Sequence, residues 1–143
     1  IGIIGETGSG KTTLLNIIAT LVAPSSGFIK INDSDELDPS KEIRKNIGYV
    51  PQTVYLSDNS ILSNVSLSNE VSHEEQRQIS KILQSLNLSS INNKPIDIFN
   101  TIGERGSKLS GGQIQRIGIA RALFRDPSIL IFFFFLLVVL KMV

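Results

Sequence analysis

The feature that most constrains this chain is a glycine-rich segment, residues 5–12, between an apolar run and an amphipathic stretch. It reads GETGSGKT and fits the pattern G-x-x-x-x-G-K-[ST]. Glycines let main-chain N–H groups close around an anion, and the N-terminus of a following helix adds positive potential. A plain glycine turn before a helix is the alternative. Because both flanks have the required type, the motif predicts a nucleoside triphosphate site.

Residue types within this loop predict separate roles at the nucleotide. We expect Lys11 to reach the β- and γ-phosphates and the Thr12 hydroxyl to bind Mg²⁺. The candidate nucleotide-binding residues are Gly5, Glu6, Thr7, Gly8, Ser9, Gly10, Lys11, Thr12 and Thr13.

Strand and helix signals alternate at both ends of the chain, with a mostly helical insert between them. Ser72 and Glu75 have the spacing of a capping box and open one of the helices. This layout predicts an α/β core with a mainly parallel sheet and a helical subdomain at about 57–124. Strands are expected at 1–4, 28–31, 47–50 and from 129 to 132, and helices at 11–21, from 72 onwards and at 110–124. The segments 57–69 and 87–100 are expected to be loops.

Composition excludes several classes of partner. The 143 residues carry a net charge of +1 and no cysteine. No global field recruits nucleic acid or an anionic membrane, and disulfides and thiolate metal sites are absent. The apolar run at 129–140 is shorter than the roughly 20 residues that span a bilayer, so a buried strand is the better interpretation of its first half. The chain begins without methionine inside an expected strand, so we expect further residues upstream.

A second motif, LSGGQ at 109–113, opens the last predicted helix. Ser110 as a cap and Gln113 three residues later form a capping box. That interpretation leaves two glycines in the first turn unexplained, because glycine lowers helix propensity. Exposed main chain and a hydroxyl at a helix N-terminus instead predict a second phosphate-binding surface. The motif comprises Leu109, Ser110, Gly111, Gly112 and Gln113.

These five residues look like the signature of ABC ATPases, and the resemblance covers nearly all of 1–132. The segment 47–52 is similar to the family's Q-loop, which implies that Gln52 lies near Mg²⁺ and the attacking water. The segment 101–106 resembles the X-loop that exporters of this family place before the signature. The X-loop candidates are Thr101, Gly103, Glu104, Arg105 and Gly106. A solvated ionic pair on a loop is the alternative explanation for Glu104 and Arg105.

The resemblance implies an ATP-binding domain of a lipid, oligosaccharide or multidrug exporter, with a P-loop NTPase core that is incomplete at both ends. ATP and Mg²⁺ would be the cofactors. Two domains would pack head to tail, with the signature of one touching ATP held by Lys11 of the other. A transmembrane domain, fused or separate, would be the further partner, and the location would be the cytoplasmic face of the cell membrane.

The family pattern stops after Phe132. Where the family has an Asp-Glu pair, this chain has Phe133 and Phe134, and phenylalanine supplies no oxygen ligand. We therefore expect ATP binding with little hydrolysis, and we treat 133–143 as an apolar tail. One hypothesis is a reading-frame change near Phe132. It fails if neither alternative frame of the DNA encodes the missing pair. The competing hypothesis is a naturally degenerate site.

Two other classes remain as alternatives. A soluble ATPase of the SMC or DNA-repair type also carries such a signature, but long coiled coils separate its motifs and no sustained heptads occur here. An inactive truncated remnant is the second alternative.

Overall fold

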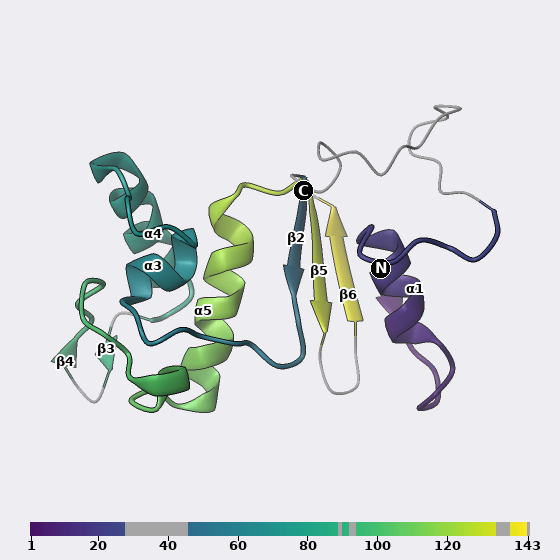
Figure 1. The fold of residues 1–143 in the computed structure, drawn as a ribbon, viewed down its shortest axis with the longest axis horizontal. Coiled ribbons are helices and arrows are strands. Elements are labelled where there is room, and N and C mark those ends of the chain that lie inside the picture. Colours follow the sequence, from purple (N-terminus) through teal and green to yellow (C-terminus); the bar gives the residue numbers. More distant parts are fainter. Residues whose placement is uncertain (28–45, 89, 92–93, 134–137, 143) are drawn as a thin grey trace.

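The computed structural model describes residues 1–27, 46–88, 90–91, 94–133 and 138–142. It has an α/β architecture in which one sheet separates helix α1 (Lys11–Ile18) from a group of helices on the other side (Figure 1). Within the described ranges, none of the helices is long and apolar enough to span a bilayer.

The main sheet has four strands in the order β1-β6-β5-β2. Strand β2 (Ile47–Val50) pairs in parallel with β5 (Ile129–Phe133), with Val50 opposite Phe132. Strand β6 (Val138–Met142) pairs antiparallel with both β5 and β1 (Gly2–Ile3). Three of the four strands therefore run in the same direction, and their carboxyl ends meet at one edge of the sheet.

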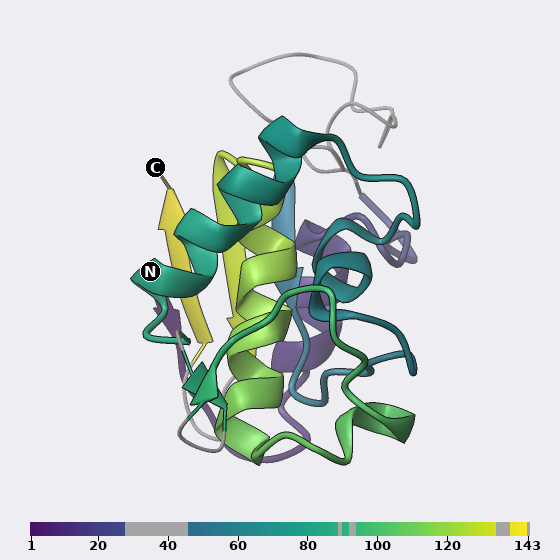
Figure 2. The same ribbon diagram turned by 90° about the vertical axis from the view of Figure 1, so that its left-hand side faces the viewer.

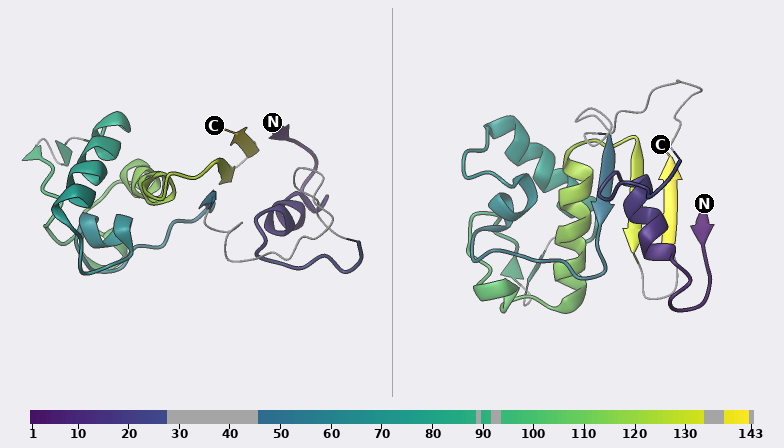
Figure 3. Two further views of the ribbon diagram at one scale, coloured as in Figure 1. Left: turned by 90° about the horizontal axis from the view of Figure 1, so that it is seen from above. Right: turned by 45° about the vertical axis from the view of Figure 1, so that its right-hand side comes forward.

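The two faces of the sheet bury different helices, because successive side chains of a strand alternate between faces. Ile131 of β5 packs with Leu15 and Ala19 of the α1 segment. Leu130 packs with Val50 and with Ala122 of helix α5 (Gly111–Phe124). The view from above in Figure 3 shows α1 and α5 on opposite sides of the sheet, and the turned view in Figure 2 shows α5 in front of it.

The largest apolar core lies between α5 and two further helices, α3 (Ile61–Ser66) and α4 (His73–Ser85). Two-residue strands β3 (Ser90–Ile91) and β4 (Lys94–Pro95) form a small hairpin beside it, and a short 3₁₀ helix, η1 (Glu104–Gly106), precedes α5. The buried members of this core are Val54, Leu56, Ile61, Leu62, Val65, Ile79, Leu83, Leu88, Ile102, Ile117 and Ala120.

Both predicted capping boxes are confirmed. The Ser72 hydroxyl accepts from the Glu75 N–H, and the Glu75 carboxylate accepts from the Ser72 N–H and hydroxyl at 2.8 and 2.7 Å. Those hydrogen bonds hold the pKa of Glu75 below its ordinary value. Ser110 and Gln113 form the equivalent pair at the start of α5. The caps fix where α4 and α5 begin.

Three sequence expectations differ from the structure. Helix α1 ends at Ile18 rather than residue 21, because Thr20 adopts φ 57° and the Leu21 N–H turns back to the Asn16 carbonyl. Of its expected apolar face, Leu14, Leu21 and Val22 are exposed. The segments 57–69 and 87–100, expected to be loops, contain α3 and the short hairpin of β3 and β4 respectively. The expected strand at 28–31 lies outside the described residues.

Two glycines of α5 predict opposite effects of the same substitution. A Cβ on Gly118 would lie 2.5 Å from Val54 Cγ2, whereas a Cβ on Gly112 meets nothing within 4 Å. We expect Gly118→Ala to lower the free energy of unfolding by about 1–3 kcal/mol through overpacking. Gly112→Ala is the matched control and should leave it unchanged or raise it by up to about 1 kcal/mol through helix propensity. Urea denaturation measures both, and equal losses in the two variants would contradict this packing.

Candidate functional site

The loop between β1 and α1 has the backbone that an anion site needs. Gly8 and Gly10 adopt φ 86° and 84°, and Gly10 is the N-cap of α1 without any side-chain cap. Residues with a side chain rarely adopt such φ values, so glycine is favoured at both positions. Residues 5–10 are all exposed. The first N–H groups of α1 thus face solvent beside a loop that is free to surround a ligand.

Lys11 lies over this loop. Its ammonium donates to the main-chain carbonyls of Gly5 at 2.8 Å and Glu6 at 2.5 Å, and to Ser9 Oγ at 3.3 Å. The side chain therefore turns back toward the turn that precedes its own helix. The hydroxyl-bearing residues that follow, Thr12 and Thr13, are exposed at the same end of α1.

Three of the predicted sites share one edge of the molecule, at the bottom of Figure 1. The glycine-rich loop follows the carboxyl end of β1, and the exposed Gln52 follows the carboxyl end of β2 by two residues. The start of α5 lies along the same edge but on the far side of the sheet. Ligands of open α/β sheets bind outside the carboxyl ends of the strands, so this edge is the candidate site.

The start of α5 is an exposed helix N-terminus with little covering it. Ser110 Oγ accepts from the Gln113 N–H at 3.3 Å, and Gln113 Oε1 accepts from the Ser110 N–H at 2.7 Å. A Cβ on Gly111 or Gly112 would meet no atom within 4 Å. Packing inside this chain therefore does not explain either glycine. The main chain at this helix start is therefore accessible from outside the chain.

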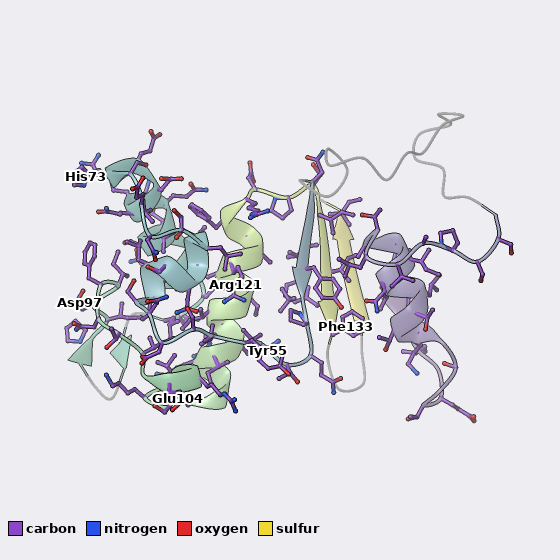
Figure 4. All side chains as sticks on the ribbon, viewed as in Figure 1. Tyr55, His73, Asp97, Glu104, Arg121 and Phe133 are labelled. Atoms are coloured by element: carbon purple, nitrogen blue, oxygen red, sulfur yellow. The ribbon has the colours of Figure 1, made fainter. Side chains whose placement is uncertain are left out.

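The segment 101–106 is a tight turn immediately before α5. Gly103 and Gly106 have φ 78° and 74°, and Arg105 adopts φ 52°, a conformation uncommon for a residue with a side chain. Lys108 Nζ donates to the Thr101 carbonyl at 3.2 Å across the turn. The side chains of Glu104 and Arg105 are exposed, and Figure 4 shows Glu104 at the same lower edge as Tyr55.

An aromatic pair occupies the carboxyl ends of β2 and β5. The ring of Phe133 lies 5.5 Å from that of Tyr49, tilted by 57°, and packs against the cluster of Leu15, Ala19 and Ile131. Tyr49 also donates its hydroxyl to Asn16 Oδ1 at 3.1 Å, and burial raises its pKa. Among the residues that the structure describes, no group of three or more His, Cys, Asp or Glu side chains could hold a metal ion.

Two polar residues that sequence reasoning did not single out organise the segment after Gln52. Buried Asn64 accepts from the Ser57 N–H at 2.9 Å and donates to the Ser57 carbonyl at 3.0 Å. Arg121 Nε donates to the Asn64 carbonyl at 2.8 Å, and its Nη2 donates to the Tyr55 carbonyl at 3.1 Å. Arg121 follows the buried Ile117 by one helical turn and so lies on the same face of α5. A charged residue on this otherwise apolar face is the sequence signal that could have identified Arg121.

Comparisons of the chain with family models, with known protein sequences and with solved structures agree on one family. The family model described as ABC transporter matches residues 1–132. The chain is 43% identical over 134 residues to a Rickettsia bellii protein with the provisional name export ATP-binding/permease protein, covering 92% of this chain and 23% of that one. It is 37% identical over 134 residues to an ATP-dependent lipid A-core flippase of Ralstonia nicotianae, with the same two coverages.

Among solved structures, the chain resembles a bacterial Atm1-family ABC exporter with ATP bound. The TM-score is 0.73 with 31% sequence identity, over 88% of this chain and 22% of that one. The chain thus spans less than a quarter of the length of these relatives. Because the family model covers 132 of its 143 residues, the chain belongs to the ABC transporter family, as an ATP-binding domain of the exporter type.

Proposed function

We propose that this domain binds ATP between two copies, with the triphosphate on the glycine-rich loop of one copy and the signature of the other. The observation that carries the proposal is the placement of α1 and α5 on opposite faces of one sheet. Two exposed helix N-termini suited to phosphate lie along the same edge, and the sheet stands between them. Within one chain the two helix N-termini cannot contact the same nucleotide. In two chains packed head to tail, the N-terminus of α1 from one copy and that of α5 from the other can.

ATP is the ligand whose chemistry fits the loop of the first copy. The turns at Gly8 and Gly10 leave main-chain N–H groups available for phosphate oxygens, and Lys11 is close enough to transfer its donors from the Gly5 and Glu6 carbonyls to the phosphates. From the second copy, Ser110, Gly111 and Gln113 would approach the γ-phosphate. The open space around Gly111 and Gly112 supports this approach.

Mg²⁺ fits the same site only in part. The Thr12 hydroxyl and the Gln52 side chain would supply oxygen ligands, together with phosphate oxygens and water. When bound, the ion would neutralise phosphate charge. The carboxylate that such a site ordinarily uses has no candidate at the end of β5, where Phe133 lies. We therefore propose nucleotide binding and domain pairing as the activity of this chain, with little hydrolysis.

Coupling to a membrane partner is the role that we propose for the edge beside the signature. Tyr55 is 79% exposed, and Glu104 and Arg105 project from a strained turn nearby. Exposed aromatic and charged groups on conformationally restricted turns are suited to contacts with another protein surface. The partner would be the transmembrane helices of an exporter, fused or separate, at the cytoplasmic face of the membrane.

Sedimentation velocity with and without ATP and Mg²⁺ tests the proposal. We expect the chain to be monomeric alone and to shift toward a dimer with ATP. Gly112→Ala should retain the fold and ATP binding but lose the shift, because a methyl group there would stand between the signature and the phosphate. An ATP-binding chain that stays monomeric at saturating ATP would favour a soluble single-domain role. Failure to bind ATP at all would favour an inactive remnant.

A further inference from the structure

We infer that Arg121 is a positioning residue that fixes the segment after Gln52 to the signature helix through a fork of two main-chain carbonyls. The inference rests on the proposed function, in which Gln52 and the signature both contact the nucleotide. Arg121 would then fix the position of Gln52 relative to the signature helix.

The geometry of the fork carries the inference. Arg121 lies in the last turns of α5, and its guanidinium donates from Nε to the Asn64 carbonyl at 2.8 Å and from Nη2 to the Tyr55 carbonyl at 3.1 Å (Figure 4). Tyr55 and Asn64 belong to different segments, the stretch after β2 and the helix α3. A planar guanidinium holds its donors at fixed angles, so it sets the spacing of the two carbonyls.

A second set of contacts extends the fork toward Gln52. Asn64 binds the Ser57 main chain through both its amide oxygen and its amide nitrogen, at 2.9 and 3.0 Å. Val54 packs against Gly118, where a Cβ would lie 2.5 Å from Val54 Cγ2. The stretch 54–57 begins two residues after Gln52 and is held at three places, to α5 through Val54 and Tyr55 and to α3 through Ser57. By contrast, Gln52 and Thr53 are exposed and lie between this attachment and the sheet.

Burial makes the fork dependent on arginine. The side chain is half-buried, and desolvation lowers the pKa of Arg121. Both of its acceptors are main-chain carbonyls that arginine satisfies together. Lysine would keep the charge and most of the aliphatic stem, but its single ammonium lacks the planar fork. A purely packing role for Arg121 would thus be rescued by lysine, and a positioning role would not.

The test uses the whole chain with Tyr55→Trp, which gives one fluorophore because the sequence contains no tryptophan. The substitution leaves the Tyr55 carbonyl in place. Arg121→Lys is compared with Arg125→Lys, an exposed arginine at the C-cap of the same helix. Amide exchange at Ser57, followed by NMR, reports how firmly the stretch 54–57 is held, because the Ser57 N–H donates to Asn64, whose carbonyl Arg121 binds. Tryptophan emission on addition of ATP and Mg²⁺ reports whether nucleotide binding changes the surroundings of residue 55.

Because the fork holds the Asn64 and Tyr55 carbonyls, we expect Arg121→Lys to loosen the Asn64–Ser57 contact and to speed exchange of the Ser57 amide about tenfold or more. It should keep ATP affinity and lose the ATP-induced change in tryptophan emission. Arg125→Lys should behave as the parent in all three measurements. Arg121→Gln replaces the lysine variant if the latter unfolds. The inference is overturned if Ser57 exchanges as in the parent, if Arg125→Lys speeds it equally, or if the emission change persists. If ATP does not bind even the parent, the proposed function fails, and the exchange measurement still decides the role of Arg121.

Discussion

Replacing Lys11 with alanine is expected to weaken ATP binding by about 100-fold or more, because each lost hydrogen bond to a charged group is worth about 1.5–3 kcal/mol and tenfold in affinity is 1.4 kcal/mol. In the structure the ammonium already lies on the glycine-rich loop, bonded to the Gly5 and Glu6 carbonyls. A cation at this place offsets the charge of the phosphates. Alanine keeps the helix but removes that charge.

Isothermal titration with ATP and Mg²⁺ measures the affinity, and thermal unfolding confirms that the variant folds. Lys81→Ala is the matched control, because Lys81 is an exposed lysine of α4, far along the chain from the loop. It should bind ATP as the parent does. If Lys11→Ala binds ATP within a few-fold of the parent, the loop is not the triphosphate site.

The second large effect concerns turnover. A positioned general base contributes typically 10²- to 10⁴-fold to a rate. This chain has Phe133 and Phe134 where the family resemblance implies an Asp-Glu pair, and the ring of Phe133 packs on Tyr49 at the end of β5. We expect ATP hydrolysis by the purified chain to stay at the background level of its Lys11→Ala variant, even where titration shows that ATP is bound.

A steady-state phosphate-release assay, run on the parent and the Lys11→Ala variant in parallel, checks this expectation. The comparison with a variant that lacks the loop lysine separates activity of this site from contaminating ATPases. Hydrolysis at ordinary transporter rates that disappears in Lys11→Ala would contradict the account. It would require a catalytic group that the aromatic end of β5 does not supply.

Local sequence signals predicted those parts of the fold that short-range chemistry decides. The capping boxes at Ser72 and Ser110 set the starts of α4 and α5, and the short apolar run at 47–50 forms β2. Helix α3 was missed because its sequence is rich in serine and asparagine. It forms because Ser60 caps it and because Ile61 and Val65 are buried against α5. Such tertiary packing has no local signature.

The end of the chain shows a different limit. From residue 129 onward the sequence is almost continuously apolar, so it carries no alternation that would place a turn. The structure ends β5 at Phe133 and returns along β6, which pairs with both β5 and β1. Strand pairing between distant segments, here Gly2 with Val139, follows from the whole sheet rather than from either segment alone.

The candidate site was likewise predictable only in part from the sequence. The two glycine-rich motifs could be found from sequence because phosphate binding needs glycine, a hydroxyl and a helix start at fixed spacing. The structure adds that Gly111 and Gly112 have open space around them, a feature that spacing cannot reveal. The roles of Asn64 and Arg121 depend on long-range contacts. Arg121 binds the carbonyls of Asn64 and Tyr55, which lie 57 and 66 positions before it in the sequence, so no local pattern predicts these contacts.

The most direct test of a shared ATP site is a mixing experiment with two variants, neither of which is expected to dimerise on its own. Lys11→Ala removes the loop half of the site, and Gly112→Ala removes the signature half. In a head-to-tail pair of one copy of each, one composite site keeps both its intact loop and its intact signature. Sedimentation velocity with ATP and Mg²⁺ should therefore show monomers for each variant alone and dimers for the mixture. Dimers in either variant alone, or monomers in the mixture while the parent dimerises, would contradict a site shared between two chains.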